Sequence, residues 1–127
     1  MTHGVPESDW KVFRDVQKVA LERFCARVLE EIEAASSDTS RSYHERYLTI
    51  YRLLQKRDKE LAPAFSYPRR SAMMIQLVAL YMRGILQPEE WARFTPQTRT
   101  GIESVVAEAR RAREPVKLHS ARSAREW

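Results

Sequence analysis

The stretch SDWKVFRDVQKVALERFCARVLEEIEAA, residues 8–35, indicates the fold class of this chain. Its apolar residues recur at steps of three and four, the spacing of one helix face. These are Trp10, Phe13, Val16, Ala20, Leu21, Phe24, Val28 and Ile32. The opposite face carries charged residues such as Lys11, Asp15 and Glu22. Ser8 stands where an N-cap is expected. A helix of this span would be roughly 40 Å long, which favours a helical bundle.

A second helix is predicted from Tyr43 to Leu61, after the helix-breaking polar run of residues 36–40. Ser42 followed by Glu45 forms a capping-box pattern at its start. Three tyrosines, two in its apolar stripe and one beside it, recur at intervals of four residues, which predicts core or interface packing with a polar tip. The stripe is Tyr43, Tyr47, Ile50, Leu54 and Leu61, flanked by Leu48 and Tyr51. Two prolines at 63 and 68 bracket a connector over residues 62–67.

Three further helices complete the predicted fold. The third runs from Pro68 to Arg83, is apolar nearly all round, and ends before Gly84. A short fourth begins at Pro88, and the fifth spans Pro96 to Arg113, before Pro115. No segment has the pattern of a strand. The sequence therefore predicts an all-α bundle of four to five helices with a long first helix.

The chain length of 127 residues predicts one domain over residues 1–113, followed by a basic, flexible tail over residues 114–127. The net charge is +5, and residues 110–127 hold six basic against two acidic residues, or +4. The body is therefore nearly neutral, and nucleic-acid binding would have to use the tail. The candidate tail contacts are Arg110, Arg111, Arg113, Lys117, Arg122 and Arg125.

Several classes of function lack the residues they need. The single cysteine, Cys25, cannot form an internal disulfide, which favours the cytoplasm. No secretory signal is expected, and the longest nearly apolar run, residues 72–82, is well short of the ~20 residues that span a membrane. The three histidines show no metal-ligand spacing, so no metal or cofactor is expected. Cys25 lies in mid-helix and His44 at a helix start, and no catalytic residue is predicted.

Two sets of residues stand out as candidate contact sites. Tyr67, Arg69 and Arg70 lie at the start of the third helix, where the helix dipole disfavours cations, so an anion or an acidic partner would compensate. The apolar residues of that helix predict either a core within one chain or a core shared in a homodimer. They are Met73, Met74, Leu77, Val78, Tyr81 and Met82. Gln76 among them is expected to point to the one exposed strip.

Three short stretches resemble a family of short, uncharacterised, helical bacterial proteins. They are residues 8–11 (SDWK), residues 42–47 (SYHERY), and Gly84-Ile85-Leu86 through Glu90 to Phe94. The resemblance covers most of residues 8–106 and implies no activity. Residues 84–94 also resemble the turn of short C-terminal oligomerisation domains, which implies self-association. The sequence departs from that turn at Thr95-Pro96, where a basic helix would continue.

The residues therefore predict a non-enzymatic helical interaction module that self-associates through apolar helix faces. The expected partner is a second copy, in a homodimer, or else another protein. The first alternative is a nucleic-acid-binding accessory protein that uses the arginine-rich tail. A helix-turn-helix reader is disfavoured, because Glu89 and Glu90 would face phosphates. The second alternative is a small helical enzyme whose site is assembled from distant residues.

Overall fold

The computed structural model describes the backbone of residues 5–126 and the side chains of residues 5–112. The all-helical prediction is confirmed, and the long first helix with it. The helices are α1 (Glu7–Ser37), α2 (Tyr43–Phe65), α3 (Met73–Met82), α4 (Pro88–Trp91) and α5 (Pro96–Glu126), with a single 3-10 turn over Arg70–Ala72. Over residues 5–126 there is no strand.

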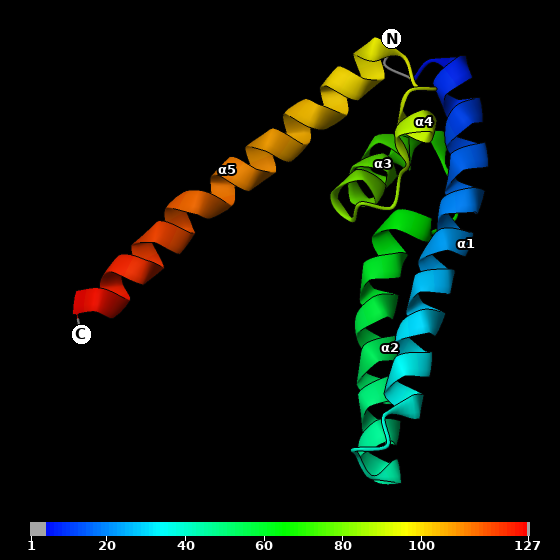
Figure 1. The fold of residues 1–127 in the computed structure, drawn as a ribbon. Coiled ribbons are helices and arrows are strands. Elements are labelled where there is room, and N and C mark those ends of the chain that lie inside the picture. The colour runs from blue at the N-terminus through cyan, green and yellow to red at the C-terminus, as the bar shows by residue number, and fades with distance from the viewer. Residues whose placement is uncertain (1–4, 127) are drawn as a thin grey trace.

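The helices form a long hairpin with a compact group at one end. Figure 1 shows α1 and α2 antiparallel, with α3 and α4 against the N-terminal half of α1. We call α3, α4, the first turns of α5 and that half of α1 the body. Beyond its first turns, α5 leaves the body at an angle to the hairpin (Figure 1). Much of the hairpin is therefore two helices thick, and one helix cannot bury two faces of its neighbour.

The core lies mainly in the body, and α3 is at its centre, which is one of the two places that its composition allowed. Met73, Leu77 and Leu80 of α3 are fully buried. They belong to a cluster of Phe13, Val16, Ala20, Phe24, Val28, Ala64, Met73, Leu77, Leu80, Ile85, Phe94, Ile102 and Val106. Toward the tip of the hairpin, no residue after Val28 in α1 and none before Ala64 in α2 is buried. The hairpin tip is thus held by few buried contacts.

The helix starts agree only partly with the sequence prediction. The Ser42 capping box is confirmed, since Ser42 Oγ accepts from the Glu45 N–H at 3.1 Å and Glu45 Oε1 accepts from the Ser42 N–H at 2.9 Å. Gly84, with φ of 67°, follows α3 as expected. Ser8 is not the N-cap of α1, because the helix begins at Glu7 after Pro6. Pro6 supplies the first carbonyl, to the N–H of Trp10 at 3.0 Å.

Two prolines do not end their helices where the sequence predicted. α2 continues through Pro63 to Phe65 because tertiary contacts hold its last turn. Ala64 is fully buried, and its carbonyl accepts from Gln17 Nε2 at 3.0 Å. The helical backbone of α5 likewise passes Pro115 and reaches Glu126, in a segment of arginine, alanine, glutamate and lysine, which are good helix formers. The division into domain 1–113 and tail 114–127 stays a prediction.

The expectation for Gln76 is wrong. Its side chain is buried at 2 % exposure instead of pointing to an exposed strip. Nε2 donates to Ser66 O at 3.1 Å and to Ser66 Oγ at 2.9 Å, so the amide ties α3 to the end of α2. α3 is covered by α1, α2 and α5, which leaves it no exposed strip at this position. Periodicity could not show this, because α3 is apolar on nearly every side.

Candidate functional site

An apolar groove runs along one side of the hairpin. It has a volume of about 340 Å³, and we call it the hairpin groove. Its lining is Phe24, Cys25, Val28, Leu29, Ile32, Leu54, Arg57, Asp58 and Leu61. Leu29 and Leu54, from the two helices, are 63 % and 42 % exposed. Two leucines this open, on facing helices and beside other apolar side chains, form a surface that a further helix can cover.

Acidic residues border the hairpin groove. Asp58 lines it, Glu33 lies one turn beyond Leu29, and Glu22 lies one turn before Cys25 on the same side of α1. All three are exposed, and none has an ion-pair partner among residues 5–112. The one cation in the lining, Arg57, is already paired with two carboxylates. The groove is therefore apolar at its floor, with unpaired carboxylates among the residues that border it.

The tyrosine stripe of α2 is on the surface of this chain. Tyr43, Tyr47 and Tyr51 are each more than half exposed. They continue the open apolar side of α2 from Leu54 toward the tip of the hairpin, at helical steps of three and four. The guanidinium carbon of Arg46 lies 4.6 Å from the centroid of the Tyr43 ring. Packing in the chain's own core is thus ruled out for these rings, and the predicted role at an interface remains a prediction.

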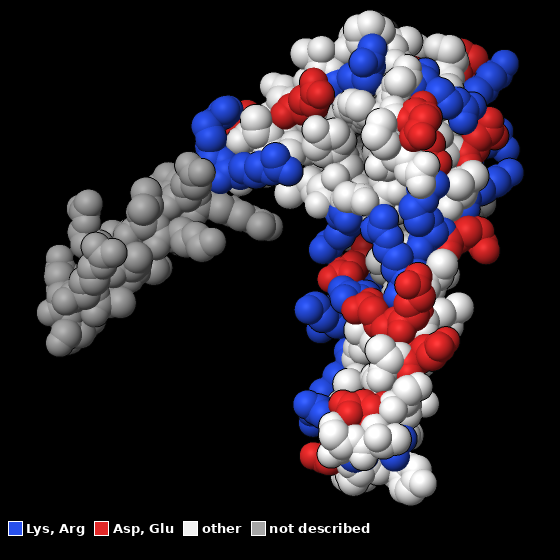
Figure 2. Space-filling model, in the orientation of Figure 1, with Lys and Arg blue, Asp and Glu red and all other residues white. Residues whose placement is uncertain are grey.

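The side of the hairpin toward Arg83 carries a network of charges, and Arg57 lies at the edge that this side shares with the hairpin groove. Arg57 donates to Glu31 at 3.0 and 2.7 Å and to Glu60 at 2.8 Å, and Arg83 lies 3.7 Å from Glu60. The hydrogen bonds from Arg57 lower the pKa of the Glu31 carboxyl below its usual value. Figure 2 shows acidic and basic side chains interspersed over the hairpin in this view. Because its charges are paired, this side offers a ligand little net attraction.

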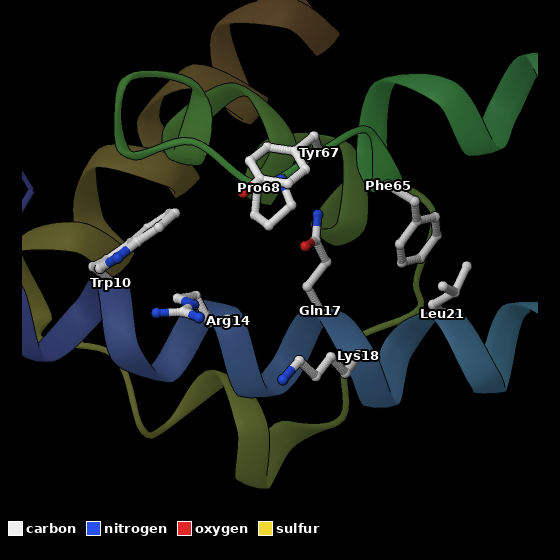
Figure 3. A pocket seen from close by; sticks show the side chains of 8 residues that line it. All are labelled: Trp10, Arg14, Gln17, Lys18, Leu21, Phe65, Tyr67 and Pro68. Carbon is white, nitrogen blue, oxygen red and sulfur yellow. The ribbon is translucent and has the colours of Figure 1, made fainter.

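A second hollow lies in the body, beside the N-terminal half of α1. It has a volume of about 500 Å³, and we call it the tryptophan pocket. Its lining is Trp10, Arg14, Gln17, Lys18, Leu21, Phe65, Tyr67 and Pro68. Figure 3 shows α1 as one wall and the connector after α2 as the other, with Trp10 and Phe65 toward opposite ends. The pocket therefore combines three aromatic rings with two cations.

Some polar groups of the tryptophan pocket have a hydrogen-bond partner within the chain, and others have neither a hydrogen-bond nor an ion-pair partner among the described residues. Gln17 is 7 % exposed, and its amide rises from α1 toward the connector (Figure 3). Its Nε2 is held by Ala64 O at 3.0 Å, and its Oε1 accepts no hydrogen bond from the described residues. Arg14 and Lys18 have no carboxylate within ion-pair distance in the described part of the chain. The lining itself contains no acidic side chain.

The predicted anion contact at Tyr67, Arg69 and Arg70 is split by the fold. Tyr67 is highly exposed and lines the tryptophan pocket. Arg70 pairs with Glu7 of α1, and its guanidinium carbon lies 5.8 Å from the centroid of Trp10. Arg69 is exposed and precedes the 3-10 turn. The chain therefore supplies Arg70 with its own counter-charge, whereas the cations nearest the pocket are Arg14 and Lys18.

The predicted interface residues of α3 lie mostly inside the chain. Met73 and Leu77 are fully buried, and Met74, Val78 and Tyr81 are partly buried against the core. Only Met82 is exposed, at 38 %. Of the predicted tail contacts, Arg110 and Arg111 are exposed on α5. Arg113, Lys117, Arg122 and Arg125 lie outside the residues whose side chains are described. Exposed apolar area therefore belongs to the hairpin more than to α3.

A metal site, a membrane-spanning helix and a catalytic nucleophile or base each require particular residues or contacts. Over the described residues there is no cluster of three histidine, cysteine or acidic side chains able to hold a metal ion. No described helix is long and apolar enough to cross a membrane. Cys25 is half-buried in the hairpin groove, and His44 is exposed in the first turn of α2. Neither has a side-chain hydrogen-bond partner from the described residues that would make it a nucleophile or a base.

Comparison of the chain with models of protein families, with curated proteins and with solved structures gave no match. The sequence did not indicate the tryptophan pocket, because its second wall comes from the connector after α2, which is far from α1 along the chain. One signal was present: Arg14 follows Trp10 by four residues and Lys18 follows Arg14 by four, so all three share one side of α1.

Proposed function

We propose that this protein is a non-enzymatic interaction module that self-associates, with α5 of one copy lying in the hairpin groove of another. The observation that carries the proposal is the hairpin groove, which is apolar at its floor and edged by unpaired carboxylates. Such a surface disfavours contact with the same acidic surface of a second copy, since like charges would meet. It favours a basic, amphipathic helix.

The chain contains one such helix. α5 has 31 residues, so it is about 46 Å long, and Val106 is its last buried side chain among those described. Val105, Ala109 and Ala112 then recur on one face at steps of four and three, and Val105 is 51 % exposed. Arg110 and Arg111 are exposed beside them. The apolar stripe of α5 suits the apolar floor of the hairpin groove, and its positive charge suits the carboxylates that border the groove.

The α5 helix that covers the groove comes from a second copy and not from the same chain. In Figure 1, α5 leaves the body at an angle to the hairpin, and its far end lies away from α1 and α2. A closed dimer in which each copy gives its α5 and receives the other's would use both surfaces twice and leave neither exposed. The exposed tyrosines of α2 would extend the contact toward the tip of the hairpin.

The test is the molecular mass of the full chain by light scattering at tens of micromolar. We expect the mass of two chains at low salt, and dissociation when Leu29→Glu and Leu54→Glu are introduced together. Val19→Glu is the matched control, because Val19 is 50 % exposed on α1 outside the groove lining. It should leave the dimer intact. A strictly monomeric wild-type chain would refute self-association.

A second pair of substitutions identifies the occupant. Arg110→Glu with Arg111→Glu removes the charge attraction, so the dimer should weaken at low salt and lose most of its dependence on salt. If this double variant dimerises like the wild type, α5 is not what covers the groove. If it loses affinity for an oligonucleotide while the dimer persists, the basic segment instead serves nucleic-acid binding, where contacts with phosphates give a steep dependence on salt.

A further inference from the structure

The tryptophan pocket is separate from the hairpin groove and has a different chemistry. Its volume of about 500 Å³ falls in the range of roughly 300–1,000 Å³ typical of small-molecule sites. Its lining joins aromatic rings, unpaired cations and one buried amide. These groups recognise different parts of a ligand, so their combination restricts the ligand more than any one of them does.

The aromatic side chains favour a planar ring. Trp10 and Tyr67 lie on opposite walls, on α1 and on the connector after α2, and Phe65 lies farther along the pocket (Figure 3). Tyr67 is 80 % exposed, an unusual position for a large ring with no partner to cover it. Stacking of a nucleobase on an aromatic side chain contributes about 1–3 kcal/mol.

The cations favour a negative group attached to that ring. Arg14 reaches over Trp10, with its guanidinium carbon 6.0 Å from the ring centroid, and Lys18 lies one turn farther along α1. Neither is neutralised by a carboxylate from the described residues. Lys11 lies on the same side of the helix, and together with Asp15 it adjoins Arg14 and Lys18 in a neighbouring hollow. The nearby Asp15 lies 3.5 Å from Arg93.

The buried amide of Gln17 adds a directional contact. Its Nε2 is fixed by the carbonyl of Ala64, which sets the orientation of the amide and leaves Oε1 as an acceptor on the pocket side. Gln17 is buried as a residue, and its amide oxygen, which accepts no hydrogen bond from the described residues, gains from a donor N–H of a ligand. Exocyclic amines and ring N–H groups of nucleobases are donors of this kind.

We propose that the tryptophan pocket binds a nucleobase that carries a phosphate group. The base lies between Trp10 and Tyr67 with its N–H edge toward Gln17 Oε1, and the phosphate lies at Arg14 and Lys18. The same chemistry is offered by a free nucleotide and by one unit of a single-stranded nucleic acid.

The experiment is calorimetric titration of the full chain with each of the four ribonucleoside monophosphates at low salt. At least one should bind with one site per chain. Its nucleoside and inorganic phosphate alone should each bind at least tenfold more weakly, since stacking and charge both contribute. If none of the four binds at millimolar concentration, or if inorganic phosphate binds as well as the nucleotide, the proposal is wrong.

Variants locate the site. Arg14→Glu and Lys18→Glu change exposed side chains, so the fold should persist, and we expect binding to weaken about tenfold or more. Arg52→Glu is the matched control, an exposed arginine on α2 outside the pocket lining, and should bind like the wild type. Equal binding by the Arg14 and Lys18 variants would place the ligand elsewhere and overturn the assignment.

Gln17 and the source of the ligand are tested in the same assay. Gln17→Glu removes the Nε2 donor to Ala64 O and adds a negative charge beside the phosphate, so nucleotide binding should weaken, and circular dichroism checks its folding. A trinucleotide of the preferred base that binds more tightly than the monophosphate identifies a single strand as the source. A trinucleotide that binds equally or more weakly identifies the free nucleotide. Either result keeps the proposed chemistry, whereas binding of a non-aromatic sugar phosphate with equal affinity contradicts it.

Discussion

The carboxylate of Asp9 caps the start of α5 through Thr95, across 86 residues of sequence. Asp9 is fully buried, and it accepts from the Thr95 N–H at 2.9 Å, from the Thr95 hydroxyl at 2.7 Å and from the Thr98 hydroxyl at 2.5 Å. A carboxylate at a helix N-terminus also interacts favourably with the helix dipole. The first turn of α1 therefore fixes the point at which α5 begins.

Asp9→Ala should destabilise the protein strongly. It removes the acceptor of three hydrogen bonds and leaves buried donors at Thr95 and Thr98 unsatisfied, a loss of about 2–4 kcal/mol in the free energy of unfolding. Urea denaturation measures it. The control is Asp15→Ala, because Asp15 is exposed and its one contact with Arg93 is 3.5 Å long. That change should cost no more than about 0.5 kcal/mol. Equal losses in the two variants would contradict the capping role.

Glu90→Gln should make stability less dependent on pH. Arg23 donates to Glu90 at 3.0 and 2.8 Å, and these hydrogen bonds hold the pKa of the Glu90 carboxyl below its usual value. Because the folded-state pKa is lowered, this stabilisation is present above the unfolded-state pKa of about 4.3 and is lost as the pH falls through the folded-state value.

The measurement is the melting temperature of wild type and Glu90→Gln between pH 7 and pH 3. The variant should be less stable at pH 7 by about 1–2 kcal/mol, and the difference should shrink at pH 3. Glu103→Gln, an exposed change on α5, is the control. A difference that stays constant over this range would mean that the ion pair contributes no pH dependence.

The two described glycines should respond oppositely to alanine. Gly84 has φ of 67°, and a Cβ there would meet nothing within 4 Å, so Gly84→Ala should cost about 1 kcal/mol through backbone conformation alone. Gly101 lies inside α5, and its Cβ would lie 3.4 Å from the flexible end of Met74. Gly101→Ala should be neutral or gain up to about 1 kcal/mol from helix propensity. Thermal unfolding of both variants checks the signs, and a stabilising Gly84→Ala would contradict the turn.

Two neighbouring residues of α3 should differ sharply. Leu77 is fully buried, so Leu77→Ala should cost about 2–5 kcal/mol in the free energy of unfolding. Ile75 is 70 % exposed, and Ile75→Ala should cost less than about 1 kcal/mol. Chemical denaturation of the two variants compares them directly. Similar losses would mean that Ile75 is covered in solution, which would return α3 to consideration as an interface.

The sequence by itself determined the helices, because their signals are local. A stripe at steps of three and four predicted α1, the pair Ser42 and Glu45 predicted the start of α2, and Gly84 predicted the end of α3. Each of these signals acts within one or two turns of the chain. The all-round apolar composition of α3 predicted that it is covered, within the chain or by a second copy, and only the structure decided between the two.

Only the tertiary structure decided which helix faces are covered. Periodicity groups Trp10, Arg14 and Lys18 on one side of α1, but the connector after α2 turns that side into a pocket. The same reasoning left the tyrosines of α2 between core and interface, and the absence of a third helix along the hairpin exposes them. Asp9 is buried because α5 begins beside it, 86 residues later in the chain. Burial depends on contacts between residues far apart in sequence, which no local pattern records.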